Sequence, residues 1–224
     1  MKQTIPFLLI FFVVSSCIEI LDDITFNIDG SGTFRYTLNL SSSQVKINSI
    51  LALDSLDGKK VPSLKDIQDR FVFFSEYLAA QEGISNVQID TNYSNYICKI
   101  KCDFTNVHFL QVGFHNSLQA TFKKLEKEEM SYDWITWNGN AMTRKVPDID
   151  KMSLPSFKSE DSDLLKKGNY TSITRFENQI DSCDNPSAIL SKNEKAVMLR
   201  KSVFDVINHH QVMDNIIYVD STSK

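Results

Sequence analysis

Four cysteines and four histidines are the side chains of this 224-residue chain with the most reactive chemistry. Cys17 stands apart near the N-terminus, and three further thiols remain, an odd number that cannot pair completely. Cys98 and Cys102 alternate with charged residues, so they share one face of a predicted strand about 13 Å apart, too far for a disulfide. We expect both to be buried as small apolar side chains, and we leave Cys183 unassigned.

The histidines do not form a recognisable catalytic or metal-binding pattern. His108 and His115 are seven residues apart on a predicted helix, so they lie about 10 Å apart along its axis, beyond joint metal binding. His209 and His210 are adjacent and diverge in any regular structure. We expect all four at the surface or on the flanks of elements, and we predict no zinc site.

Other short motifs likewise indicate no catalytic or ligand-binding chemistry. The chain lacks the glycine-flanked serine of hydrolases, a phosphate loop and a dinucleotide glycine pattern. The segment Asp29-Gly30-Ser31-Gly32 lacks the ligands of a calcium loop and predicts a turn. Asp181, Asp184 and Asn185, beside Cys183, could hold a hard cation, but a solvated loop is the simpler interpretation. No catalytic residue, metal site or cofactor is predicted.

Composition narrows the class of protein. The chain has 24 Lys and Arg against 28 Asp and Glu, a net charge of −4, and the two signs are interspersed, so nucleic acid is not an expected partner. A hydrophobic content of 42% with only 7 Gly and 5 Pro indicates a folded chain. The 15 Phe predict a bulky, aromatic-rich interior.

The N-terminus has the composition of a removed signal peptide. Met1-Lys2 provides a positive start, residues 5–14 are apolar, and two serines precede Cys17. A helix that spans a bilayer needs about 20 apolar residues, so this run is too short to remain as an anchor. We expect residues 1–16 to be removed.

Val14-Ser15-Ser16-Cys17 resembles the lipobox of bacterial lipoproteins. The resemblance implies that the Cys17 thiol receives a diacylglyceryl group, that cleavage occurs before Cys17, and that its new amino group is acylated, as with palmitate. The membrane is then a partner through Cys17. Ile18 in place of Asp resembles outer-membrane sorting, and without an acidic run after Cys17 we expect the periplasmic face. The alternative is a plain signal peptide with an incidental cysteine.

A second resemblance covers about the first 25 residues after cleavage. Cys17 followed by a strand and Asp29-Gly30-Ser31-Gly32 is similar to uncharacterised envelope lipoproteins of Bacteroidota. It implies no activity and no catalytic residue. Because the first strand begins almost at Cys17, we expect the protein to lie close to the membrane surface.

Hydrophobic periodicity predicts the elements of the first half. Alternating apolar residues on both sides of the Gly30 turn predict a hairpin. A helix is expected over 44–53, and a second from Ser63, with Asp66 in a capping box, to Gly83. Phe73 and Tyr77 widen its apolar face, which indicates either a helix buried on more than one side or an apolar groove. A hairpin over 87–104 follows.

The second half begins with a third helix whose stripe contains Val107, Leu110, Phe114, Leu118, Phe122 and Leu125. A hairpin over 132–146 carries Tyr132, Trp134 and Trp137, which we expect to be buried, with stacking on sugars or a partner as the alternative. Residues 147–168 predict a polar loop or linker. Strands are expected over 170–180, 188–190, 195–205 and 216–219, while 203–213 fits either period.

We therefore predict an α+β fold, with an antiparallel sheet of hairpins, two to three helices on one face and a β-rich C-terminal part. The expected units are an α+β domain over 17–146 and the C-terminal part over 169–224, separate or completing the same domain.

Three functions remain open for a lipid-anchored protein of the bacterial envelope. The leading hypothesis is non-enzymatic, with an envelope protein as partner or a role in envelope maintenance. The second is a carrier or sensor of an apolar ligand, held between the Phe-rich helices and the sheet. The third is a hydrolase whose site is assembled only in space. A filled core beneath Phe71, Phe74, Phe114 and Phe122 would contradict the carrier hypothesis.

Overall fold

A computed structural model describes residues 18–56, 58–122, 133–146 and 165–220. The first half contains β1 (Glu19–Phe26), β2 (Gly32–Asn39), the short η1 (Ser41–Ser43), α1 (Gln44–Leu51), β3 (Ser55–Leu56), β4 (Lys59–Lys60), α2 (Leu64–Ala79), β5 (Ile84–Asn92), β6 (Ile97–Phe104) and α3 (Val107–Phe122). The predicted hairpins and helices of this half are confirmed.

The second half contains β7 (Ile135–Trp137), β8 (Ala141–Arg144), β9 (Asn169–Phe176), β10 (Ile180–Cys183), β11 (Ile189–Leu190), β12 (Ala196–Ser202), α5 (Val203–Asn208), η3 (His210–Met213) and β13 (Asn215–Val219). The α+β class and the strand-rich C-terminal part are confirmed. Leu125, Tyr132 and most of the predicted polar loop lie outside the described residues.

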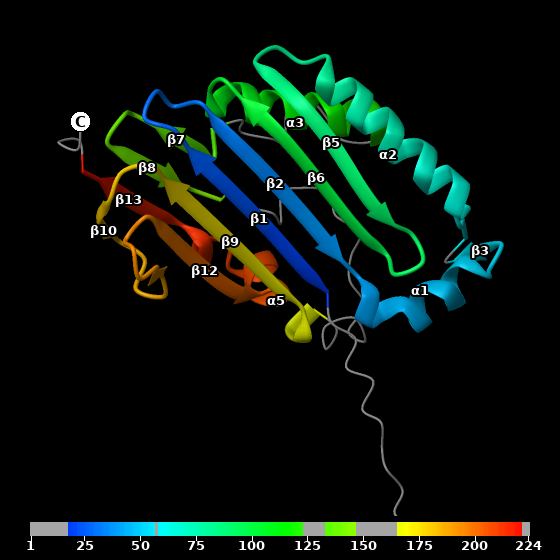
Figure 1. Ribbon diagram of the computed structural model, residues 1–224. Coiled ribbons are helices and arrows are strands. Elements are labelled where there is room, and N and C mark those ends of the chain that lie inside the picture. Colours follow the sequence, from blue (N-terminus) through cyan, green and yellow to red (C-terminus); the bar gives the residue numbers. More distant parts are fainter. Residues whose placement is uncertain (1–17, 57, 123–132, 147–164, 221–224) are drawn as a thin grey trace, which may run out of the picture.

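The main sheet has seven strands in the order β11-β12-β9-β1-β2-β6-β5 (Figure 1). Neighbouring strands pair antiparallel, with one exception: β9 lies parallel to β1, with Asn169 opposite Glu19 and Phe176 opposite Phe26. The sheet is therefore mixed. Because Gly30 adopts a positive φ of 84°, the turn between β1 and β2 closes as the sequence predicts.

One face of this sheet forms the core. Ile24 and Phe26 of β1, Phe34 of β2, and Cys102 and Phe104 of β6 point into it and are buried. The opposite face is largely polar, as shown by the pair between Asp23 and Arg175, whose Oδ1 and Nε are 2.9 Å apart. The two faces follow from the period-two alternation of the strands.

Two long helices cover part of the apolar face (Figure 1). The predicted capping box begins α2: Ser63 Oγ accepts a hydrogen bond from Asp66 N at 3.1 Å, and Ser63 N donates to Asp66 Oδ2 at 2.9 Å. After α2, β5 begins at Ile84, opposite Phe104, where β6 ends. Because α3 starts just after Phe104, α2 and α3 are antiparallel, and the start of α2 and the end of α3 share one end of the sheet.

The rest of the same face is covered by a four-stranded sheet in the order β10-β13-β8-β7. Its contact with the main sheet includes stacked rings of Phe26, Trp137 and Phe176, whose centroids are 5.4–5.7 Å apart. Trp134 and Trp137 are both half-buried and pack against the core, in agreement with the preferred interpretation.

Two predicted boundaries are wrong. The strand expected over 170–180 ends at Phe176, and Ile180 begins a separate strand, β10. The strand expected over 195–205 ends at Ser202, where α5 begins, because the Ser202 side chain accepts a hydrogen bond from Asp205 N at 3.0 Å and so caps a helix. The ambiguous segment 203–213 is accordingly helical, as α5 and η3.

Candidate functional site

A large cavity lies between the two long helices, the apolar face of the main sheet and the edge of the four-stranded sheet. Its volume is about 720 Å³, within the range of about 300–1,000 Å³ that is usual for small-molecule sites. Its lining is overwhelmingly apolar and includes Phe34, Ile67, Phe71, Phe74, Ile100, Leu110, Phe114, Leu118, Phe122, Trp134, Ile135, Val146, Val206 and Met213. Phe71, Phe74, Phe114 and Phe122 therefore surround a cavity and not the filled core that would contradict the carrier hypothesis.

Aromatic packing holds the walls of this cavity in place. The Phe114 ring of α3 stands edge-on to Phe34 of the sheet, with centroids 5.1 Å apart, and to Phe74 of α2, at 5.6 Å. Such edge-to-face pairs stabilise by about 0.5–1.5 kcal/mol beyond their buried area. Phe114 thus packs α3 against both the sheet and α2 on one side of the cavity, and the space between the remaining lining residues is open.

The exposed lining residues lie at one end of the cavity. Pro62 precedes α2, Arg70 lies in its first half, and Phe122, which is 45% exposed, ends α3. By contrast, Ile135 and Met213 are at most 1% exposed. The rim of the cavity therefore lies at the end of the sheet where α2 starts and α3 ends.

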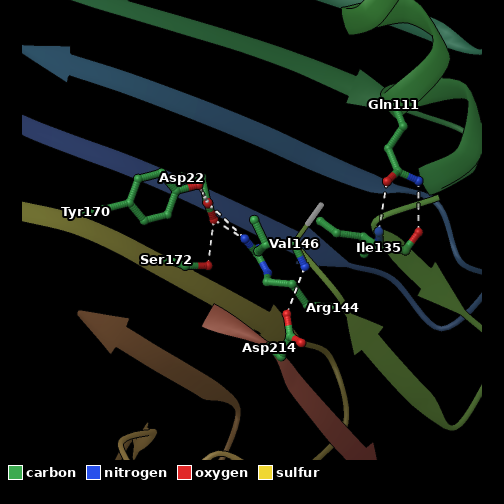
Figure 2. Close-up of polar contacts among 8 residues, drawn as sticks. All are labelled: Asp22, Gln111, Ile135, Arg144, Val146, Tyr170, Ser172 and Asp214. Carbon is green, nitrogen blue, oxygen red and sulfur yellow. Dashed lines mark hydrogen bonds and ion pairs between the residues drawn. The ribbon is translucent and has the colours of Figure 1, made fainter. Parts of the chain in front are cut away.

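A buried ion pair joins Asp22, which lines the cavity, to Arg144 of β8 (Figure 2). The guanidinium of Arg144 donates from Nη1 to Asp22 Oδ2 at 3.0 Å and from Nη2 to Asp22 Oδ1 at 3.1 Å. Ser172 Oγ donates to Asp22 Oδ1 at 2.7 Å, and the Tyr170 hydroxyl donates to Asp22 Oδ2. Asp22 and Arg144 are only 1% and 2% exposed, so the pair joins the two sheets inside the core.

These contacts keep the cavity lining around Asp22 electrically neutral. Burial alone would lower the pKa of Arg144, but the adjacent Asp22 carboxylate raises it above its usual value, so the guanidinium stays charged. Burial, reinforced by the Asp22 charge, raises the pKa of Tyr170 well above its usual value, so its hydroxyl keeps its proton. The Trp134 ring covers the guanidinium, with 5.1 Å between the guanidinium carbon and the ring centroid.

Tyr36 offers a hydroxyl to the cavity. It lines the cavity opposite Asp22 in the strand register, and its side-chain hydroxyl makes no hydrogen bond with another residue of the described part of the chain. Burial, together with the Asp22 charge, raises the pKa of Tyr36 to about 12, so the hydroxyl is a neutral donor at physiological pH. Tyr36 is therefore suited to bind the polar end of an otherwise apolar ligand.

The wall that faces α3 is fixed by a pair of hydrogen bonds (Figure 2). Gln111 Nε2 donates to the Ile135 carbonyl, and Ile135 N donates to Gln111 Oε1, both at 2.8 Å. In the neighbouring segment, Val146 N donates to Asp214 Oδ1 at 2.9 Å. Because the amide of Gln111 pairs with the backbone of β7 in both directions, the wall has a defined position.

The histidines are placed differently from the sequence expectation. His115 is buried in the wall of the cavity, which corrects its predicted surface position, because its face of α3 turns inward. Burial lowers the pKa of His115, and a hydrogen bond with Gln119 opposes this effect only in part. The lowered pKa favours the neutral imidazole. His108 lies at the surface, with Nδ1 3.1 Å from Asp133 Oδ1.

Three free thiols and one acidic loop complete the candidates. Cys98 and Cys102 are buried on β6, as predicted, and burial with a nearby Asp raises the pKa of Cys98 to about 11 and that of Cys102 to about 12. The Asn185 side chain accepts from Ser187 N within its own loop and donates to the Val212 and Asp214 carbonyls before β13, at 3.2 and 2.7 Å. Among the described residues, no three His, Cys, Asp or Glu side chains gather as metal ligands would.

The principal residues that the sequence analysis missed are Asp22, Arg144, Tyr170 and Tyr36. A signal for the first was present: Asp22 occupies an even position in the alternation of β1, where every other inward side chain is apolar. A carboxylate at such a position needs a buried partner. The sequence does not indicate which cationic side chain is that partner, because Arg144 is 122 residues away. Cys17, the one predicted site residue, lies outside the described residues.

Comparison with known proteins adds little. No protein-family model matches the chain, and no curated protein sequence matches it significantly. A solved structure, the NMR structure of the Mycobacterium tuberculosis LppM (Rv2171) protein folded domain, aligns with 100% of this chain and 99% of its own at 12% identity, with a TM-score of 0.41. A likeness at this level carries no conclusion. No helix in the described parts of the chain is long and apolar enough to cross a membrane.

Proposed function

We propose that this protein is a lipid-anchored carrier or sensor of the bacterial envelope, which holds an apolar ligand in the cavity between α2, α3 and the main sheet. The observation that carries the proposal is the cavity itself, about 720 Å³ of space lined by aromatic and aliphatic side chains. Attachment through an acylated Cys17 rests on the lipobox-like sequence at residues 14–17. The carrier hypothesis therefore moves ahead of partner binding.

The lining favours a ligand with a long alkyl chain and one small polar end. Burial of each CH₂ group contributes about 0.8 kcal/mol, so about a dozen buried groups contribute on the order of 10 kcal/mol before the costs of association. The ion pair of Asp22 and Arg144 is internally neutralised. The polar end is then best served by the Tyr36 hydroxyl, which donates a hydrogen bond to a carbonyl, hydroxyl or carboxyl oxygen.

The hydrolase hypothesis gains less support from the same cavity. A hydrolase site would need convergent carboxylates, or a histidine beside an acid, in a cleft. Among the described lining residues, Asp22 is the acid and His115 the histidine, and both hydrogen-bonded oxygens of Asp22 are occupied by Arg144, Tyr170 and Ser172. An acid so engaged is poorly placed to act as a general base.

Titration with a fluorescent long-chain fatty acid tests the proposal. Leu118→Trp places a larger side chain in the cavity, whereas Val72→Trp places the same side chain on the exposed side of α2, where Val72 is 54% exposed. We expect the full chain and the Val72→Trp variant to bind the probe with similar affinity, and Leu118→Trp to bind it at least about tenfold more weakly. Equal affinity in all three would contradict a site in this cavity.

A further inference from the structure

The end of the molecule that carries the cavity rim is also the end where the described chain begins. Glu19 opens β1 opposite Asn39, the last residue of β2, and Ile18 accepts a hydrogen bond from Asn169 N at 2.7 Å, where β9 opens. The start of α2 and the end of α3 lie at this same end. In the sequence, the proposed anchor Cys17 stands two positions before Glu19, which opens β1 at this end.

An unusually exposed segment follows β2 at this end. It consists of η1, α1 and the β3–β4 hairpin; Figure 1 shows α1 near the start of β1, and β3 farther along, near the start of α2. No residue of α1 is buried. Its position is nevertheless fixed, because Leu40 N donates to the Tyr96 carbonyl at 3.0 Å, Gln44 Nε2 donates to the Ser94 carbonyl at 2.6 Å, and the Tyr96 hydroxyl donates to Asn48.

This segment presents apolar side chains to the outside. We call them, together with the first residue of α2, the apolar collar; its members are Val45, Leu53, Leu56 and Leu64, which are 38–73% exposed. The described residues of the same segment include three exposed lysines, Lys46, Lys59 and Lys60, and one acidic residue, Asp54, so the charge of this described part is positive. Leucine and valine beside lysine suit a membrane interface with anionic headgroups.

The collar leads directly into the cavity rim. Pro62 and Ile67, which line the cavity, flank Leu64 in the sequence, and Arg70 follows one turn later. We infer that the apolar collar rests in the headgroup region of the membrane that holds Cys17, so that the open end of the cavity faces the bilayer and a lipid moves between the two without crossing water. This inference rests on the proposed function, since it needs both the anchor and the ligand cavity.

Fluorescence quenching in vesicles tests this orientation. The full acylated chain is reconstituted in vesicles of phosphatidylethanolamine and phosphatidylglycerol that contain brominated lipid, as Leu56→Trp and as Ile28→Trp. Both positions are exposed, at 43% and 61%, but Ile28 lies in the turn between β1 and β2 at the opposite end of the sheet. The unmodified chain, reconstituted in the same way, gives the background from the half-buried Trp134 and Trp137.

We expect brominated lipid to quench the added Trp of Leu56→Trp at least about twofold and to leave that of Ile28→Trp unchanged. Equal quenching of the two, or no quenching at Leu56, would overturn the inference. Titration with the fluorescent fatty acid separates the two levels of failure. If both variants bind the probe while Leu56→Trp is not quenched, the orientation is wrong and the carrier function stands; if the unmodified chain does not bind the probe, the function itself fails.

Transfer kinetics give a second readout that does not depend on an added Trp. If the collar contacts the bilayer, the rate at which the probe passes to acceptor vesicles rises with vesicle concentration, and Leu53→Glu with Leu56→Glu slows it severalfold at unchanged affinity. The matched variant Ile189→Glu, on β11, leaves the rate as it was. A rate that is independent of vesicle concentration would indicate release into water and would overturn the inference.

Discussion

The pair of Asp22 and Arg144 gives the sharpest prediction for stability. Both side chains are almost fully buried, so removal of one partner leaves an uncompensated charge in the core. Such a loss costs about 3–5 kcal/mol, whereas loss of both charges together costs far less. We choose Asp22→Asn and Arg144→Met. Asn removes the charge at nearly the same size and keeps one of the two oxygens that accept from Ser172 and Tyr170, and Met keeps much of the arginine's apolar length.

A double-mutant cycle in urea measures the effect. We expect each single variant to lose about 3–5 kcal/mol of unfolding free energy, and the double variant to lose at least about 2 kcal/mol less than the sum of the two. The structure supplies a matched control on the neighbouring residue: Asp23 pairs with Arg175 on the polar face, where the Arg175 side chain is 42% exposed. The same cycle with Asp23→Asn and Arg175→Met should give a coupling of about 1 kcal/mol or less.

The two cycles together decide whether burial controls the strength of the pair. A coupling between Asp22 and Arg144 that is no larger than that between Asp23 and Arg175 would refute the reasoning, because both arginines bind their carboxylate through two nitrogens. The pairs differ in their access to solvent and in the contacts that Ser172, Tyr170 and Trp134 add to the buried pair.

Further predictions concern the helix cap, the thiols and the anchor. Ser63→Ala should destabilise the protein by about 1 kcal/mol in urea unfolding, since it removes the capping box of α2; no change would mean that the cap is dispensable. At pH 8, iodoacetamide should modify the partly exposed Cys183 at least about tenfold faster than Cys98 and Cys102, whose thiols burial keeps protonated, as mass spectrometry can show; equal rates would place these cysteines outside the core. Metabolic labelling with a fatty acid should mark the wild-type protein and not Cys17→Ala, and equal labelling of both would remove the proposed anchor.

Local patterns in the sequence were sufficient for most of the elements. The hairpin around Gly30 and the capping box of Ser63 and Asp66 depend on residues close in the chain, so their chemistry can be read directly. The end of β12 depends on an equally local signal, Ser202 and Asp205, but the apolar alternation runs through it and obscures the cap. In that case the periodicity outweighed the cap signal in the prediction.

Long-range features could not be predicted in the same way. The parallel pairing of β1 with β9 joins residues about 150 positions apart, and no local pattern specifies that choice. The cavity has the same origin. Phe71, Phe114 and Phe122 have the spacing of core residues whether the space among them is filled or open, because periodicity reports which face is apolar and not how closely it packs. His115 was misplaced because only the orientation of α3 turns that side chain inward.

The most direct test of the central claim is native mass spectrometry of the full chain extracted from its membrane in a mild detergent. We predict a complex that carries one additional apolar ligand in the unmodified chain and in Val72→Trp, with that additional mass lost in Leu118→Trp, whose larger side chain enters the cavity. The claim is contradicted if the spectra of the two variants are the same, or if the unmodified chain carries no ligand even after incubation with an excess of a long-chain fatty acid.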